Sequence, residues 1–188
     1  MQDIKGLNLI ELKKVLKGWQ EEEFHARQVF TWIYKKGVRD FAAMSDLSSS
    51  LRLKLKENFS LGSLKLKDVR LSVDGTEKFL FELLDKNSVE AVSIPAEGRV
   101  TGCVSTQVGC KFACRFCASA IKGFKRNLSV SEILEQALML KDCSQAKRLT
   151  HLVFMGTGEP LDNYENVLKA IRVINSKDAL NIGSRRIT

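Results

Sequence analysis

The sequence has no long apolar run and no export signal. No stretch approaches the roughly 20 consecutive apolar residues that a transmembrane helix needs. The N-terminal run MQDIKGLNLIELKKVLKGW carries acids and lysines throughout and lacks the apolar segment of a secretory signal. We therefore expect a cytoplasmic protein that contacts no membrane, in which the five cysteines are reduced thiols available to a metal or to redox chemistry.

Internal repeats and low-complexity tracts are also missing. The 188 residues are enough for one medium domain or two small ones. The hydrophobic fraction of 44% and the charged fraction of 28% are ordinary for a soluble globular protein. These properties favour a folded protein with a sizeable apolar core.

Positive charge is distributed unevenly along the chain. The net charge is +8, and residues 111–148 hold eight basic side chains against three acidic ones. Residues 61–109 are near neutral, with six basic and seven acidic side chains. The excess lies beside a group of cysteines, where it would attract a polyanion such as nucleic acid. The alternative is that these lysines and arginines are simply solvated on helix surfaces.

The first sixty residues are predicted to be helical. Phe24–Lys36 places an apolar stripe on one helical face, formed by Val29, Phe30, Ile33 and Tyr34. Leu47–Phe59 is a second predicted helix, and Ser48 offers an N-cap. We interpret the aromatic side chains as core packing rather than as platforms for stacking bases.

A small antiparallel element is predicted for residues 61–97. Its strands are Leu66–Val73, Glu77–Leu84 and Val89–Ile94, with an Asp-Gly turn signal between the first two. In the third strand the period of two places Glu90 on the bulkier apolar face, which would raise its pKa if that face were buried. The alternative is an edge strand from which Glu90 points to water.

From residue 98 onward, strands and helices alternate. The predicted elements are a strand over Arg99–Ser105, a helix from Ser129 to about Lys141, a strand over Arg148–Gly156, a helix over Tyr164–Asn175 and the start of a third strand at RRIT. This order favours a parallel sheet or barrel, in which ligands collect at the C-terminal ends of the strands. The run GCKFACRFCASA and the run GTGEP both follow strand ends, so both should face one site.

Three cysteines lie close together in GCKFACRFCASA, as Cys110-x3-Cys114-x2-Cys117. A structural zinc site needs a fourth soft ligand. The candidates for that ligand are Cys103, Cys143 and His151, none of which lies in the run. A four-iron cluster fits better, because three thiolates leave one iron open to a small molecule. Phenylalanines 112, 116 and 124 are expected to screen the cluster from solvent.

The cysteine spacing after a strand resembles the signature of radical S-adenosylmethionine (SAM) enzymes. A closer resemblance, to the RlmN family, is carried by Cys103–Gln136, Val89–Pro95, Val153–Val167 and Phe24–Ser48. It implies an α/β fold: a helical RNA-binding region over residues 1–60, a small β element over 61–97 and the first part of a radical SAM partial (β/α) barrel over 98–188. It also implies methylation of adenine C2 in 23S rRNA and tRNA.

The resemblance further implies cofactors, partners and residue roles. The cofactors would be a 4Fe-4S cluster and S-adenosyl-L-methionine, and the electron donor a protein such as flavodoxin; we expect a monomer. Cys110, Cys114 and Cys117 match the cluster ligands, and Gly158 and Glu159 match residues that hold the amino group of S-adenosylmethionine. Glu90 matches the proton acceptor, and Cys103 the cysteine that resolves a covalent protein–RNA intermediate. Cys143 matches no family residue and is expected to pack at a helix end.

The sequence departs from the family at its C-terminal end. The family's methyl-carrying cysteine lies beyond RRIT, and no cysteine follows Cys143. We therefore expect the N-terminal portion of a longer enzyme, inactive in methyl transfer by itself. Two alternatives stay open at this point: a Cfr-type enzyme that methylates adenine C8, and a non-catalytic zinc-bound RNA-binding module.

Overall fold

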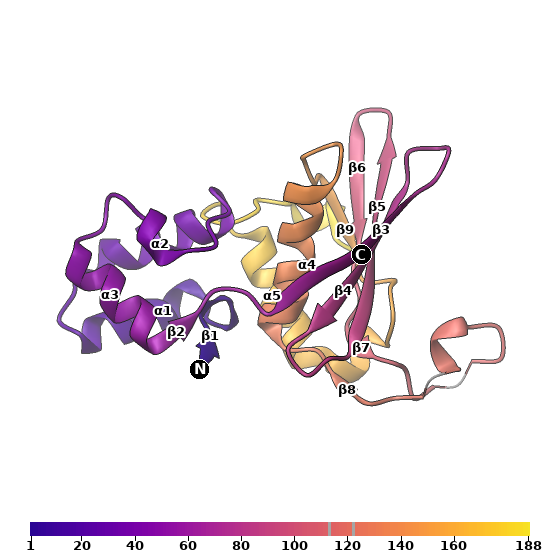
Figure 1. Cartoon of the computed structure of the whole chain (residues 1–188), viewed down its shortest axis with the longest axis horizontal. Coiled ribbons are helices and arrows are strands. Elements are labelled where there is room, and N and C mark those ends of the chain that lie inside the picture. The colour runs from indigo at the N-terminus through magenta and orange to yellow at the C-terminus, as the bar shows by residue number, and fades with distance from the viewer. Residues whose placement is uncertain (113, 122) are drawn as a thin grey trace.

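The computed structural model describes residues 1–112, 114–121 and 123–188. A group of N-terminal helices lies at one end of the molecule and a twisted sheet at the other, with α4 (Val130–Cys143) and α5 (Tyr164–Asn175) between them (Figure 1). No helix in the described part of the chain is long and apolar enough to cross a membrane.

The N-terminal region is helical, as predicted. It consists of η1 (Ile4–Gly6), α1 (Leu9–Gly18), α2 (Glu23–Tyr34), η2 (Phe41–Ala43) and α3 (Ser49–Asn58), with β1 (Gln2–Asp3) paired in parallel with β2 (Phe59–Ser60). The four apolar residues predicted to share a face of α2 are all buried. Ser48 caps α3 by accepting a hydrogen bond from the backbone N–H of Leu51. The aromatic residues of that face therefore pack in the core.

One five-stranded sheet joins the two β-containing regions that the sequence suggested. Its strands are β3 (Leu64–Leu71), β4 (Glu77–Leu83), β5 (Ser88–Ala96), β6 (Arg99–Cys103) and β9 (His151–Val153), in that spatial order. The pairing is antiparallel from β3 to β6 and becomes parallel between β6 and β9. The small antiparallel element is thus continuous with the first parallel strands.

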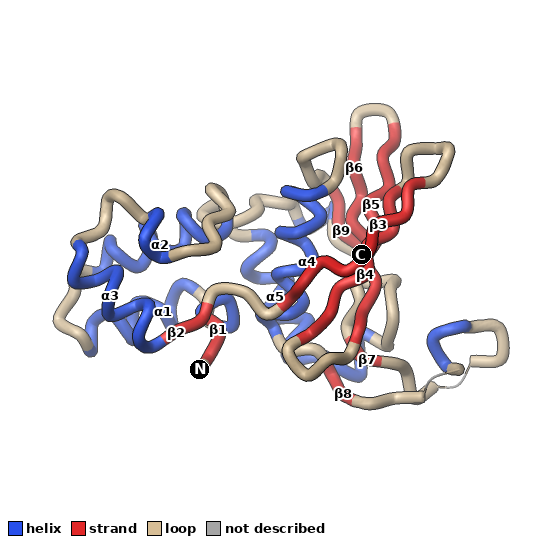
Figure 2. Tube along the Cα trace, viewed as in Figure 1, coloured by secondary structure: helices blue, strands red, loops and turns tan. Residues whose placement is uncertain are grey.

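The two faces of this sheet differ in what covers them. Figure 2 shows the long helices gathered on one side of the strands. On that side a β-carbon added at Gly102 would stand 3.1 Å from the side chain of Leu140 in α4. The buried side chains of this face include Phe79, Phe81, Val89, Ala91, Val104 and Leu152. None of the described helices covers the opposite face, and we refer to it below as the open face.

The remaining elements hold the loops at the ends of the strands. They are β7 (Gln107–Val108) paired with β8 (Arg126–Asn127), η3 (Ala118–Ala120), η4 (Pro160–Asn163) and η5 (Ser184–Arg186). Ser129 and Glu132 form the predicted capping box at the start of α4. The predicted third strand is represented by a single parallel bridge from Ile187 to Leu152, because a 3-10 turn covers the residues before it.

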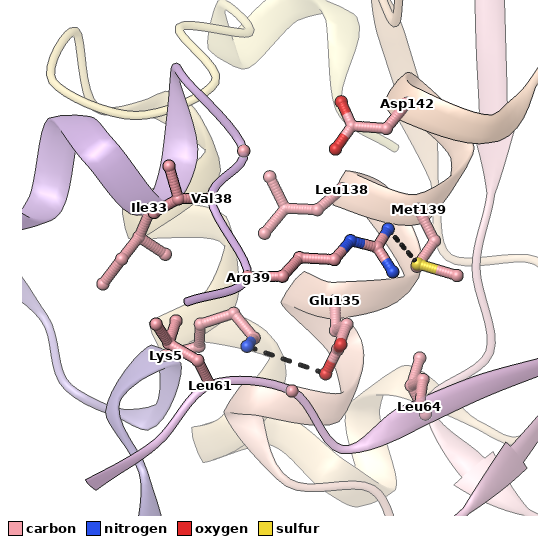
Figure 3. Close-up of a pocket in the computed structure, with 12 residues that line it drawn as sticks. Lys5, Ile33, Val38, Arg39, Leu61, Leu64, Glu135, Leu138, Met139 and Asp142 are labelled. Carbon is pink, nitrogen blue, oxygen red and sulfur yellow. Dashed lines mark hydrogen bonds and ion pairs between the residues drawn. The ribbon is translucent and has the colours of Figure 1, made fainter. Parts of the chain in front are cut away.

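The N-terminal helices are joined to α4 by a buried ion pair. Lys5, which is 4% exposed, lies 3.7 Å from the carboxylate of Glu135 (Figure 3). The backbone N–H and the hydroxyl of Ser63 donate to the same carboxylate oxygen. A cavity of about 190 Å³ lies beside this joint. Its lining, over the described residues, includes none of the predicted site residues.

Candidate active site

The three clustered cysteines lie on a loop that leaves β7 and returns in β8, residues 109–125, here termed the cysteine loop. Its two ends meet tightly. Gly109 has a φ of +75°, and a β-carbon there would stand 1.7 Å from the carbonyl oxygen of Gly123. The backbone N–H of Lys125 donates to the carbonyl of Val108, 2.8 Å away. Glycine is required at residue 109 because only it fits this approach in this conformation.

The cysteines occupy one turn and its approach. The backbone N–H of Cys117 donates to the carbonyl of Cys114 over 3.0 Å, which closes a turn around these two residues. Cys110 and Cys117 are half-buried, Cys114 is exposed, and no disulfide joins any of the chain's cysteines. The donor set is three soft thiols, which suits an iron–sulfur cluster with one open iron. Within the described residues, no three Cys, His, Asp or Glu side chains are grouped closely enough to hold a metal.

The phenylalanines of the cysteine loop are exposed. Phe112 is 55% exposed, Phe116 is 94% exposed and Phe124 is 40% exposed. Figure 1 shows the described part of the loop projecting away from the sheet. That these rings screen a cluster from solvent stays a prediction from the sequence.

The return end of the cysteine loop is anchored by Arg126. Its guanidinium donates two hydrogen bonds to Glu132 at the start of α4, over 2.9 and 2.8 Å. It also donates to Asp85, in the turn between β4 and β5, over 2.7 Å. The hydrogen bond from Arg126 holds the pKa of Asp85 well below its usual range. One arginine thus ties the loop to a helix and to the sheet.

The GTGEP loop, residues 156–160, follows β9 and docks on the segment before the cysteine loop. The carbonyl of Thr157 accepts hydrogen bonds from the backbone N–H groups of Thr106 and Gln107. Gly158 has a φ of +107°, and a β-carbon there would stand 2.5 Å from that of Gln107. The GTGEP loop therefore packs on the segment that leads into the cysteine loop, and Gly158 lies at that contact.

Gln107 is the centre of that contact, and its role was not predicted. Its side chain is fully buried; the amide nitrogen donates to Asn127 and to Asp162, each over 2.8 Å, while the amide oxygen accepts from the backbone N–H of Glu159. Both N–H groups of the amide and its oxygen are thus engaged, by β8, by η4 and by the GTGEP loop. A glutamine in a short polar run gives no sequence signal of this kind.

Glu159 is half-buried at the start of η4. One carboxylate oxygen accepts a hydrogen bond from the backbone N–H of Leu161, over 3.0 Å, and so caps this short helix. The residue was predicted to accept an ammonium group. The structure gives its carboxylate a local structural partner as well.

Glu90 and Cys103 lie on the same face of the sheet. Val92 and Cys103 are directly paired across β5 and β6, so their side chains point to one face, and Glu90 lies two residues before Val92 on that face. This is the open face. Burial raises the pKa of the Cys103 thiol, and a hydrogen bond from the backbone of Met155 partly offsets that effect.

Neither sequence interpretation of Glu90 is fully correct. β5 is paired on both sides from Val92 onward, so it is not an edge strand, although the ladder partner of Glu90 is Leu80 of β4 alone. The face that carries Glu90 is nevertheless not buried, because no helix in the described part of the chain covers it. The Glu90 side chain is half exposed and forms an ion pair with Lys78 of β4, over 3.1 Å.

Ser105 connects the strand of Glu90 to the GTGEP loop. Its hydroxyl donates to the carbonyl of Glu90 over 2.7 Å and accepts from the backbone N–H of Thr157 over 2.9 Å. Its own backbone N–H donates to the side chain of Gln136 in α4. This fully buried serine, which the sequence did not single out, fixes three elements relative to one another.

A cavity of about 450 Å³ lies between β5, the cysteine loop and the GTGEP loop. Glu90, Gly109, Gly123 and Thr157 are among its lining residues. Of the predicted site residues Glu90 lines it directly, while Cys110 and Gly158 follow lining residues along the chain. The structure thus brings Glu90, the root of the cysteine loop and the GTGEP loop to one cleft. Cys143, expected to pack at a helix end, is exposed at the last position of α4.

Comparison with known proteins separates the chain into two matched parts. Residues 2–61 match the ribosomal RNA large subunit methyltransferase N-terminal domain, and residues 104–188 match the radical SAM superfamily. A protein of Clostridium novyi named "Probable dual-specificity RNA methyltransferase RlmN" is 46% identical over the whole chain and 55% of its own length. The Thermotoga maritima protein of the same name is 44% identical, again over the whole of this chain and 55% of its own length. Over its whole length the chain is therefore similar to proteins named RlmN.

A solved structure supports the same assignment. The radical SAM methyltransferase of Sphaerobacter thermophilus is 35% identical and superposes with a TM-score of 0.92 over the whole chain and 56% of its own length. The RlmN resemblance and the mixed α/β fold with the first part of a radical SAM barrel are therefore confirmed. The chain spans about half the length of the curated relatives it matches.

Proposed function

We propose that the chain supplies the cluster-binding and cosubstrate-binding part of a radical SAM methyltransferase that modifies C2 of an adenine in 23S rRNA and tRNA. The observation that carries this proposal is the cavity between β5, the cysteine loop and the GTGEP loop. It places a carboxylate, the root of a three-thiol loop and a glycine-rich loop around one space. The named activity of the relatives supplies the substrate class.

Three thiols would hold the cluster. Cys110, Cys114 and Cys117 are the ligands in this proposal. Their loop would take its final conformation on binding the metal, because metal binding and folding of the ligand-bearing segment are coupled. The chemistry that such a cluster supplies when bound is one-electron reduction of S-adenosylmethionine. The absence of a fourth thiol in the loop leaves one iron for the amino and carboxylate groups of that molecule.

The GTGEP loop would bind the methionine end of S-adenosylmethionine. Glu159 carries the negative charge that an ammonium group needs, and a charged hydrogen bond of this kind is among the stronger ones. Gly158 would permit close approach of the backbone to the ligand. The anchoring of this loop by Gln107 and Ser105 holds the carboxylate in place before the ligand arrives.

The open face of the sheet would receive the adenine. Glu90 lines the cavity and is half exposed, so its carboxylate can reach a base and take the proton from the methylated carbon. Cys103 is on the same face, and its thiol would resolve the protein–RNA bond. The target adenine must be unstacked to enter. Positive charge in residues 111–148 would attract the RNA backbone.

Anaerobic reconstitution with iron and sulfide tests this proposal. A brown chain whose electron-spin resonance signal changes on addition of S-adenosylmethionine is the expected result. A colourless chain with stoichiometric zinc would contradict it and support a zinc-bound RNA-binding module. A product methylated at C8, from a full-length relative with these motifs, would support the Cfr-type alternative. The electron donor, the monomeric state and the cytoplasmic location stay predictions from the sequence.

A further inference from the structure

An ion pair joins the cysteine loop to η4, directly beyond the GTGEP loop. Lys111, the residue after Cys110, contacts the Asp162 carboxylate, and Asp162 lies three residues after Glu159. The two residues come from loops that are far apart in the chain, at the ends of β7 and β9. Their pairing spans the two sides of the proposed cofactor site. Neither residue belongs to the predicted ligand set.

Asp162 is a fixed partner for this contact. Its other carboxylate oxygen accepts a hydrogen bond from the buried amide of Gln107 over 2.8 Å, and its backbone N–H donates to the carbonyl of Glu159 over 3.1 Å. The Asp162 side chain is 19% exposed, whereas that of Lys111 is 51% exposed. A partner that is already ordered reduces the side-chain entropy lost when an exposed pair forms. Hydrogen bonding by Lys111 lowers the pKa of Asp162.

Lys111 also lies near the rings of both arms of the cysteine loop. Its ammonium is 6.0 Å from the ring centroid of Phe112 and 5.8 Å from that of Phe124. Phe124 is next to Gly123, where the loop closes. The Lys111 side chain therefore lies close to both arms of the cysteine loop and contacts η4.

We propose that Lys111 and Asp162 form a positioning pair that holds the cysteine loop against η4 and the GTGEP loop before cluster and cosubstrate bind. The link to those groups rests on the function proposed above, whereas the contact itself does not. Loss of the pair leaves all three thiols in the sequence but loosens the loop that carries them. The cysteine loop then spends more time away from Glu159.

Proteolysis of the metal-free chain tests the contact directly. Phe116, 94% exposed in the cysteine loop, is a chymotrypsin site. Asp162→Asn removes the charge but keeps an oxygen for Gln107, and leaves the loop sequence unchanged. We expect cleavage after Phe116 to become about threefold faster, the effect of an exposed ion pair. Glu165→Gln is the matched control, because Glu165 is an exposed acid of the next helical turn. Its cleavage rate should equal that of the unmodified chain.

Salt and a conservative replacement distinguish a positioning pair from general loosening. At about 1 M salt the difference between Asp162→Asn and the unmodified chain should disappear, because exposed charges are then screened. Lys111→Met should behave like Asp162→Asn, and Lys111→Arg should restore slow cleavage. Equal cleavage of Asp162→Asn and Glu165→Gln at low salt, or a difference that salt leaves unchanged, would overturn the proposal.

The reconstituted chain tests the link to the cluster. Asp162→Asn should lose iron to a chelator about threefold faster than the Glu165→Gln control. Equal loss would overturn that link. If neither the unmodified chain nor any variant takes up a cluster, the proposed function fails. Proteolysis of the metal-free chain still shows whether the ion pair holds the cysteine loop.

Discussion

The α-carbon of Gly109 lies against the carbonyl group of Gly123, so that the cysteine loop closes backbone to backbone. A β-carbon at Gly109 would stand 1.7 Å from that oxygen, whereas one at Gly123 meets nothing within 4 Å. Both residues have positive φ, at +75° and +63°. The two glycines are therefore needed for different reasons, one for space and conformation, the other for conformation alone.

Alanine substitutions separate these reasons. Gly123→Ala should lower the free energy of unfolding by about 1 kcal/mol, the cost of a left-handed conformation. Gly109→Ala adds a clash with backbone and should cost about 3 kcal/mol or more, or force the loop root apart. Urea unfolding of the two variants measures the difference. Equal destabilisation would show that the loop root is not closed as described.

The ion pair between Arg126 and Glu132 predicts a pH dependence of stability. Burial raises the pKa of Glu132, but hydrogen bonds from Arg126 and Ser129 outweigh it, and the net pKa lies below the ordinary value of 4.5. A depressed pKa in the folded state contributes stability that is fully present above about pH 4.5 and is lost as the pH falls through the folded pKa.

Glu132→Gln tests this dependence. At pH 7 the free energy of unfolding of the variant should be about 2 kcal/mol lower than that of the unmodified chain. That difference should shrink as the pH falls below about 4.5. Glu57→Gln removes an exposed acid on α3 and serves as the control for the loss of one negative charge. A Glu132→Gln difference that is constant from pH 7 to pH 3 would contradict the assignment.

The raised pKa of Cys103 predicts slow alkylation. At pH 8 a thiol with a raised pKa holds less thiolate, so iodoacetamide should label Cys103 at least about threefold more slowly than the exposed Cys143. Peptide mass spectrometry over time measures both rates in one sample. In urea the two rates should converge. If Cys103 were labelled faster than Cys143 in the folded chain, its thiol would not be partly buried as described.

Two substitutions at Glu159 separate binding from capping. Glu159→Gln keeps an oxygen for the N–H of Leu161 but removes the charge, and should weaken S-adenosylmethionine binding to the reconstituted chain about tenfold at unchanged stability. Glu159→Ala should also destabilise the chain by about 1 kcal/mol, because it removes the cap. Equal affinity of Glu159→Gln and the unmodified chain would remove the ammonium role.

Local patterns predicted the helices well. The helix over Tyr164–Asn175 has the expected bounds, and Ser129 with Glu132 marks the start of α4 as predicted. Capping boxes and apolar periodicity are short-range signals, and they act within one turn or one helix. These elements therefore depend little on the rest of the fold.

The strands were predicted less well, because their ends depend on neighbours. β9 is shorter than the predicted Arg148–Gly156 at both ends. On its N-terminal side the Thr150 hydroxyl accepts a hydrogen bond from the backbone N–H of Val100 and donates to the carbonyl of the same residue. β5 continues past the predicted stop at Pro95. Its last partner in β4 is opposite Ser93, so Pro95 lies where one side of β5 is open and a missing N–H has no cost.

The candidate site was predicted in its motifs and not in its connections. The cysteine spacing and GTGEP indicated two loops at one site, and both loops contribute lining residues to one cavity. Gln107, Ser105, Lys111 and Asp162, which hold the loops together, carry no motif. Their hydrogen-bond and ion-pair partners are distant in the sequence, so one amino-acid sequence gives no signal of these pairings. The exposure of the loop phenylalanines also depends on the tertiary structure, so the sequence does not predict it.

The hairpin of β5 and β6 has a practical consequence. One uninterrupted piece of chain, residues 90–103, carries both the carboxylate of Glu90 and the thiol of Cys103; β6 pairs Cys103 with Val92, and β4 pairs Leu80 with Glu90. A protein engineer who moved that piece into another sheet would keep the spacing of acid and sulfur by giving it a neighbouring strand in the place of β4. The loops around the cleft could then be chosen anew for a different substrate.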